Sequence, residues 1–299
     1  MYSLVSASVL GFDLTRLPGG EAVAEVLLRA LTLRADDLPV LAAQLPAADD
    51  RAGLWADVQR AASQVPTVRD VGVGELTIGT LAGIRRAPIG TVDGLLTCLR
   101  HDILSWTWIG AGRTARQAPD AAAATSVLCD AAVAGYLRDL LSVDARRRLA
   151  APWVRARRKL ADPPPVDLGP HHGAVDGLLG QVRAMPPSAA RRLSRAVDEY
   201  RRSDPNGWAA SVHSASWAAY LSDRVRTAAA AQLLLVQALD TSAVSAHDRA
   251  AGVWNLLSGA AQALVVRDLL DTQAAHRLVA PVLSVFGPAW LPEPRDNRM

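Results

Sequence analysis

The sequence predicts an all-α protein built from two similar helical halves. Alanine and leucine recur at spacings of three and four residues with charged residues between them, which is the periodicity of amphipathic helices. Alternating β-branched segments, which indicate strands, are nearly absent. The chain also repeats itself: Arg-Asp-Leu-Leu at 138–141 and Arg-Leu-x-Ala-Pro at 148–152 recur 129 residues later, at 267–270 and 277–281. We interpret the repeat as two copies of one helix followed by a helix end.

The helices are expected where this periodicity runs on without a cluster of glycine or proline. Before the middle of the chain they cover 21–33, 38–44, 52–64, 92–108, 120–141 and 143–159. After it they cover 175–184, 188–202, 207–240, 246–270 and 272–285. We therefore expect an N-terminal helical extension (1–70), a first helical half (71–160), a Pro-rich linker (161–174) and a second helical half (175–299).

The composition excludes several classes of protein. Lys159 is the only lysine, so neither a phosphate loop with its Gly-Lys-Ser/Thr sequence nor a pyridoxal-binding lysine is expected. The net charge of +3 is small for 299 residues and gives no general case for nucleic acid. Two cysteines, Cys98 and Cys129, indicate a reducing compartment. Residues 1–14 make a poor signal peptide and no long apolar run occurs, so we expect a cytoplasmic protein without a membrane partner.

Metal and cofactor sites are also not expected. None of the five glutamates is followed by histidine three residues later, which excludes the di-iron motif of helical bundles. The acidic pairs at 36–37 and 49–50 lack the further acidic residue of the terpene cyclase motif, and a dinucleotide loop at 72–90 lacks a preceding strand. The set His213, His247, Asp248 and Asp268 has the order of a metal phosphohydrolase but is a weak candidate. We predict no metal and no cofactor.

The strongest candidate site lies around residue 213. His213, Trp217, Tyr220 and Arg224 follow one another at steps of four, three and four, and so fall within an arc of about 60° on one helix. His213 can act as a general base or acid and Tyr220 as a proton donor, so we predict these two as catalytic. Trp217 and Arg224 are predicted to bind substrate, Arg224 as a clamp for a carboxylate or phosphate. The alternative is that Trp217 and Tyr220 belong to the core.

A weaker set of the same kind occurs in the first half. His101 and Trp108 share one face of the expected helix 92–108. If both faces line one cavity between the halves, Trp254 joins them and the cavity is rich in tryptophan. We therefore add His101, Trp108 and Trp254 to the predicted substrate-binding residues. Packing of a tryptophan-rich helix against its neighbours explains His101 and Trp108 equally.

The run from Arg146 to Lys159 is the one nucleic-acid candidate. Seven of its fourteen residues are basic and none is acidic. Trp153 sits within it, where a base-stacking platform would be. Leu149, Val154 and Leu160 occur at near-helical spacing, so a solvated helix face, an acidic partner or an anionic substrate suits the run as well. The duplicated Arg-Asp pairs at 138–139 and 267–268 are interpreted as structural ion pairs or helix-end devices.

Our leading hypothesis is a cofactor-independent enzyme of cyclase, isomerase or lyase type. It would act on an aromatic or polycyclic small molecule in a Trp-lined cavity. One alternative is a non-catalytic helical scaffold or regulatory protein-binding module. A second alternative is a nucleic-acid binder that uses the basic run, although nucleic acid is not the expected partner; self-association is left open.

Overall fold

The computed structural model describes residues 19–64, 96, 99–100, 103, 119–160, 168–245, 248 and 252–287. Within these residues the chain is helical and contains no strand, which confirms the all-α prediction. The chain divides into two compact units, Met1–Pro165 and Val166–Met299. The predicted linker 161–174 contains this boundary, but also a 3-10 turn and the first residues of a helix.

Several predictions lie outside the described residues. They are the N-terminal segment 1–14, the glycine-rich stretch 71–91 and most of the expected helix 92–108. Among the helices that the structure does describe, none is both long enough and apolar enough to span a bilayer.

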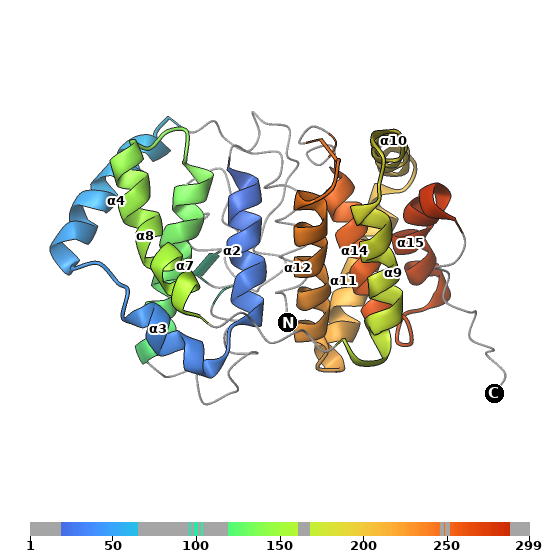
Figure 1. Cartoon of the computed structure of the whole chain (residues 1–299), viewed down its shortest axis with the longest axis horizontal. Coiled ribbons are helices and arrows are strands. Elements are labelled where there is room, and N and C mark those ends of the chain that lie inside the picture. The colour runs from blue at the N-terminus through green and yellow to red at the C-terminus, as the bar shows by residue number, and fades with distance from the viewer. Residues whose placement is uncertain are drawn as a thin grey trace. The chain divides into compact units, whose positions relative to one another are not determined.

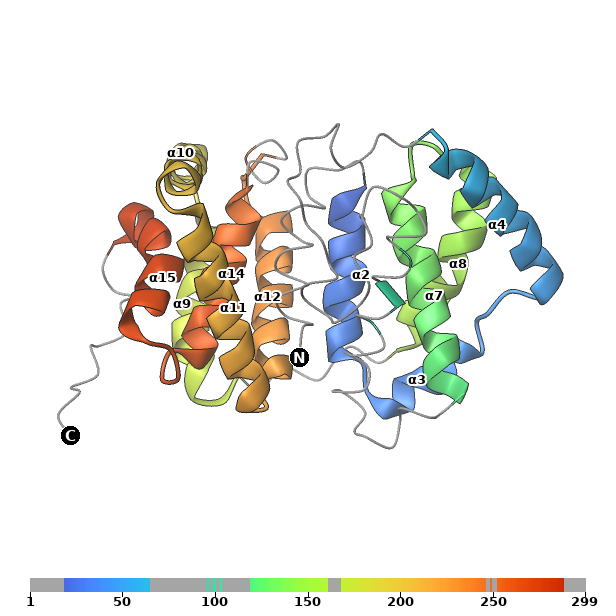
Figure 2. The same cartoon turned by 180° about the vertical axis from the view of Figure 1, so that it is seen from behind.

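Unit 1 is organised around one helix, α7 (Pro119–Tyr136). This helix contacts α2 and α8, which lie on either side of it in Figures 1 and 2, and also the short α3. Most of its side chains are buried, as expected for a helix covered from several directions. The described elements of the unit in chain order are α2 (Gly20–Thr32), η1 (Ala35–Asp37), α3 (Leu38–Ala42), α4 (Ala48–Ala62), α7 and α8 (Val143–Lys159).

Two glycines allow α2 and α7 to approach closely. Gly19, immediately before α2, has φ +77°, a conformation that costs little only for glycine. A Cβ atom on Gly19 would lie 1.6 Å from the carbonyl oxygen of Gly135. A Cβ atom on Gly135 would lie 2.9 Å from Cβ of Ala22. The packing of α2 on the core of unit 1 therefore depends on the absence of these two side chains.

The helix α8 has the bounds that the sequence predicts. Ser142 caps its N-terminus, because its hydroxyl accepts a hydrogen bond from the backbone N–H of Ala145 at 3.2 Å. One face is buried and contains Leu149, Pro152 and Trp153. Its last turn is basic, which complements the negative end of the helix dipole.

Unit 2 surrounds α14 (Trp254–Val266), all of whose side chains are buried. This helix contacts α9, α11, α12 and α15 (Figure 1). The described elements of the unit in chain order are η3 (Gly169–His171), α9 (His172–Arg183), α10 (Pro187–Ser203), α11 (Pro205–Leu221), α12 (Val225–Asp240), α14 and α15 (Thr272–Phe286). Asp271 caps α15 as Ser142 caps α8.

The predicted single helix 207–240 is wrong, because the chain forms two helices there. The first, α11, ends at Leu221, and Asp223 adopts a left-handed conformation with φ 60°. Aspartate tolerates this conformation better than most residues, so neither glycine nor proline marks the break in the sequence. The predicted helix 246–270 ends too late, since α14 ends at Val266, and most of 246–251 lies outside the described residues.

Candidate functional site

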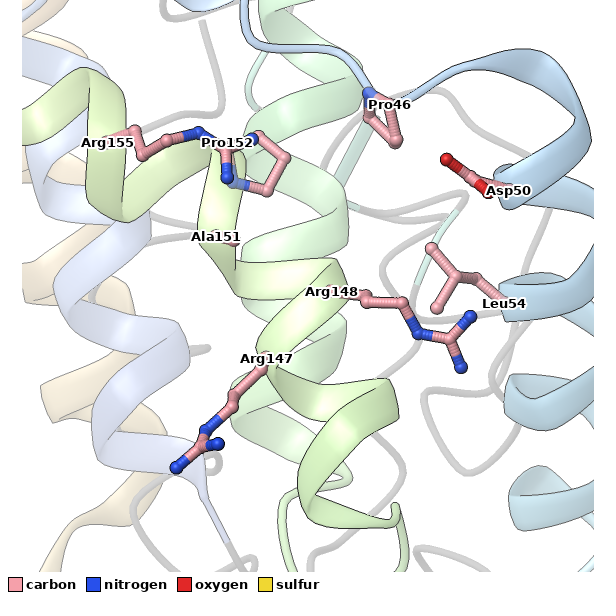
Figure 3. A pocket seen from close by; sticks show the side chains of 8 residues that line it. All are labelled: Pro46, Asp50, Leu54, Arg147, Arg148, Ala151, Pro152 and Arg155. Atoms are coloured by element: carbon pink, nitrogen blue, oxygen red, sulfur yellow. The ribbon is translucent and has the colours of Figure 1, made fainter.

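The candidate site is a pocket between α4 and α8 in unit 1. Figure 3 shows that α8 forms one wall, and that α4 and the turn before it form the other. The pocket has a volume of about 330 Å³. Three of its eight lining residues are arginines and one is an aspartate. The lining residues are Pro46, Asp50, Leu54, Arg147, Arg148, Ala151, Pro152 and Arg155.

Two of the three arginines have partners within unit 1. Arg148 extends from α8 toward α4 (Figure 3), where it lies 3.8 Å from a carboxylate oxygen of Asp57. Its Nε atom lies 3.3 Å from Asp144. Arg155 donates a hydrogen bond through Nε to the side chain of Gln44 at 3.3 Å. Both terminal nitrogens of Arg155 lack a hydrogen bond to any residue that the structure describes.

Arg147, the third arginine of the pocket, has no ion pair or hydrogen bond with a described residue. It is exposed, and so is Arg158, which likewise has no such partner. Arg157, on the adjacent side of α8, is paired with Glu25 of α2 at 2.7 Å. Carboxylates therefore neutralise Arg148 and Arg157. Arg147 and Arg158, which define the outer side of α8, remain available to bind carboxylate or phosphate.

The structure excludes one feature of the predicted nucleic-acid site. Trp153 is buried on the inner face of α8, so it cannot serve as the stacking platform that the sequence suggested. Val154, which the spacing placed with the inner apolar residues, is instead exposed. The reason is the helical phase: Leu149, Pro152, Trp153 and Ala156 define the buried stripe, and Val154 lies well away from it.

The predicted catalytic face lies on α11 of unit 2. His213 and Trp217 are both exposed on this helix. The backbone of Tyr220 belongs to α11, but its side chain is outside the described part of the structure. Arg224 does not share the face, because α11 ends at Leu221. The proton-exchange role of His213 and Tyr220 remains a prediction.

Arg224, at the start of α12, instead links the turn after α11 to the end of α14. Its two terminal nitrogens bind the two carboxylate oxygens of Asp268 at 2.5 and 2.9 Å, and one of them also donates to the carbonyl oxygen of Val265. The hydrogen bond from Arg224 lowers the pKa of Asp268. Burial and the nearby Arg224 together lower the pKa of His171, which belongs to η3. Arg224, which was predicted to bind substrate, is thus already paired with Asp268 of the same chain.

Replacing Asp268 with asparagine is expected to lower the free energy of unfolding by about 1 kcal/mol or less, because the pair is half exposed. A carboxyl group with a lowered folded-state pKa stabilises the fold above its unfolded pKa, and this stability is lost as the pH falls through the folded pKa. The destabilisation caused by Asp268→Asn should therefore be measurable at pH 7 and disappear in acid. A double-mutant cycle with Arg224→Met checks this: additive effects would contradict a direct pair.

Of the remaining predicted substrate-binding residues, the structure describes Trp254 alone. Trp254 is buried in the core of unit 2. His101 and Trp108 lie outside the described residues. In the described ranges, no three or more His, Cys, Asp or Glu side chains are grouped so that they could hold a metal ion.

Asp130 in α7 is a buried carboxylate that was not among the residues predicted from the sequence. Its side chain is 4% exposed, and one oxygen lies 3.4 Å from Arg51 of α4, which also donates to Ser126 at 2.8 Å. Burial raises the pKa of Asp130 to about 6, although Arg51 and Arg100 oppose the rise. The signal was present in the sequence, since an acidic residue in the middle of an otherwise apolar helix needs a partner inside the fold.

The neighbouring Cys129 is buried as well, and burial raises the pKa of its thiol to about 12. A thiol in this environment is not a nucleophile near neutral pH. No family model, curated protein or solved structure matches the chain.

Proposed function

We propose that the protein is a non-catalytic helical binding module, and that unit 1 binds an anionic partner at the α4–α8 pocket and the outer side of α8. The observation that carries this proposal is the pair of exposed arginines, Arg147 and Arg158, which have no partner among the described residues. The neighbouring arginines Arg148 and Arg157 have carboxylate partners.

One carboxylate in the pocket lining lowers the affinity of the pocket for anions. Asp50, in the first turn of α4, contributes the one carboxylate of the pocket lining. It opposes any incoming negative charge at close range, whereas Arg147 and the free nitrogens of Arg155 attract it. An anion bound here is therefore expected to respond in opposite directions to the removal of Asp50 and of the arginines.

A fluorescein-labelled peptide of about ten glutamates is a suitable probe, with binding followed by fluorescence anisotropy. We expect the affinity to fall as salt is added, because exposed charges are screened. The variant Arg147→Ser/Arg155→Ser should bind several-fold more weakly, and Asp50→Asn, which keeps the side-chain shape, several-fold more tightly.

The control for net charge is Arg191→Ser/Arg192→Ser, which removes two exposed arginines of α10 in unit 2. It should leave the affinity unchanged. If this control weakens binding as much as the α8 variant does, the protein attracts the probe through its overall charge and the proposed site is refuted.

We also propose that both units are built around one duplicated helical hairpin, α7–α8 in unit 1 and α14–α15 in unit 2. In support, α8 and α15 begin 129 residues apart, at Val143 and Thr272. The residue before each helix, Ser142 or Asp271, caps it through a side-chain oxygen. Serine and aspartate are both favoured N-cap residues, so both helices keep a side-chain cap although the residue differs.

Two further positions support the duplication. Pro152 and Pro281 are the tenth residues of α8 and α15, and both are buried. Leu140 and Leu269, in the turns before these helices, are exposed to similar degrees, 41% and 43%. Matching burial at matching positions is what a shared hairpin requires.

A further inference from the structure

The outer side of α8 presents a repeated arrangement of valine and arginine. Val143 and Val154 are 54% and 44% exposed, and each is followed four residues later by an exposed arginine, Arg147 and Arg158. Residues eleven positions apart on an α-helix differ in direction by only about 20° and in height by about 16 Å. The two valines therefore form one line along the helix, and the two arginines form a second line beside it.

The exposed apolar side chains in the described part of unit 1 are concentrated at this place. The large hydrophobic side chains that are exposed in the described part of unit 1 are Leu140, Val143 and Val154. All three belong to α8 or to the turn that leads into it. Single exposed hydrophobic residues are normal on protein surfaces, but Val143 and Val154 share one face of α8, which suggests a contact surface.

The charges of this face determine which partner suits it. Arg147 and Arg158 lack carboxylate partners among the described residues, so an incoming surface that carries negative groups can pair with both. Valine side chains gain nothing from phosphate groups, and Trp153 is buried and unavailable for stacking on bases. A surface that is both acidic and apolar, which is the character of a protein rather than of a nucleic acid, complements the face.

We infer that the outer side of α8 docks an acidic amphipathic helix of a partner protein. This inference rests on the proposed function and names its partner class. The partner's apolar side chains pack on Val143 and Val154, while its Asp or Glu side chains pair with Arg147 and Arg158. The repeat of about 16 Å matches three turns of the partner helix, so both pairs of contacts are made at once.

The test uses a labelled helical peptide of about 20 residues, long enough to follow α8, with leucine and glutamate repeated at the eleven-residue spacing of the valines and arginines. A second peptide replaces every glutamate with glutamine. The protein variants are Val143→Ser/Val154→Ser and Arg147→Ser/Arg158→Ser, with Arg191→Ser/Arg192→Ser of α10 as the control. All substituted side chains are exposed, and circular dichroism verifies that the variants keep their helical content.

We expect the acidic peptide to bind at least about tenfold more tightly than both the glutamine peptide and the glutamate probe of the preceding section. Each α8 variant should lose about tenfold, and the α10 control should lose nothing. The loss in the valine variant is decisive, because simple attraction of a polyanion does not depend on these side chains.

Three other results overturn the inference. If the acidic peptide binds no more tightly than the glutamate probe and the valine variant binds normally, the anion site stands but the helix-docking surface does not. If a labelled DNA duplex binds more tightly than the peptide, the partner class is nucleic acid. If neither the peptide nor the glutamate probe binds, the proposed function fails together with the inference.

Discussion

Replacing Gly19 with alanine is expected to destabilise unit 1 by about 3 kcal/mol or more. The left-handed backbone at φ +77° costs an alanine about 1–2 kcal/mol, and its Cβ atom would lie 1.6 Å from the carbonyl oxygen of Gly135. A backbone atom cannot move aside as a flexible side chain can, so α2 must withdraw from α7. Urea unfolding followed by circular dichroism measures the loss, and hydrogen exchange in α7 assigns it to unit 1.

Gly53→Ala is the matched control for this prediction. Gly53 lies within α4 of the same unit, and a Cβ atom there meets nothing within 4 Å. Alanine at this position should be neutral or should stabilise the protein by up to about 1 kcal/mol, because it favours the helix. If Gly19→Ala unfolds at the same urea concentration as the parent protein, α2 and α7 do not approach as described.

Replacing Asp130 with asparagine is expected to stabilise the protein near neutral pH by about 1–3 kcal/mol. The pKa of Asp130 is about 6 in the folded state against an ordinary value of 3.8, because burial disfavours the charged form. Between these pH values the folded state binds more protons than the unfolded state, so the stability contributed by this group falls as the pH rises from about 4 to about 6. Asparagine resembles the protonated carboxyl and removes this loss.

The measurement compares the free energies of unfolding of the two proteins at several pH values from 4 to 8. The difference should be small near pH 4, grow up to about pH 6 and stay constant above it. Asp139→Asn provides the control, since this carboxylate is exposed and its ion pair among the described residues is with the exposed Arg138. A variant that is less stable than the parent at pH 8 would show that the ion pair with Arg51 outweighs the cost of burial.

Local sequence signals were sufficient where a helix is defined by its own residues. The bounds of α8 were predicted from the periodicity of its own residues, and the structure has the same bounds. The bounds of α2 and α15 were predicted in the same way to within about one residue. Periodicity and helix ends act over a few residues, so they can be recognised in one segment without knowing its neighbours.

The candidate site was only half visible in the sequence. The basic run 146–159 was recognised, but the distinction between paired and unpaired arginines was not. The arginines of α8 pair with side chains that lie far away in the sequence, namely Glu25, Gln44 and Asp57. No local sequence pattern predicts these pairs. The arginines of the run 146–159 that can bind a partner are therefore those that do not already pair with carboxylates or amides of other elements.

The sequence by itself determined the helical class and the positions of helices such as α2, α8 and α15, because these follow from residue spacing along a single segment. Only the tertiary structure decided that Arg224 binds Asp268, that Trp153 is buried and Val154 exposed, and that Asp130 is enclosed beside Arg51. These outcomes depend on contacts between segments distant in the chain, where helix packing and burial select the partner of each side chain.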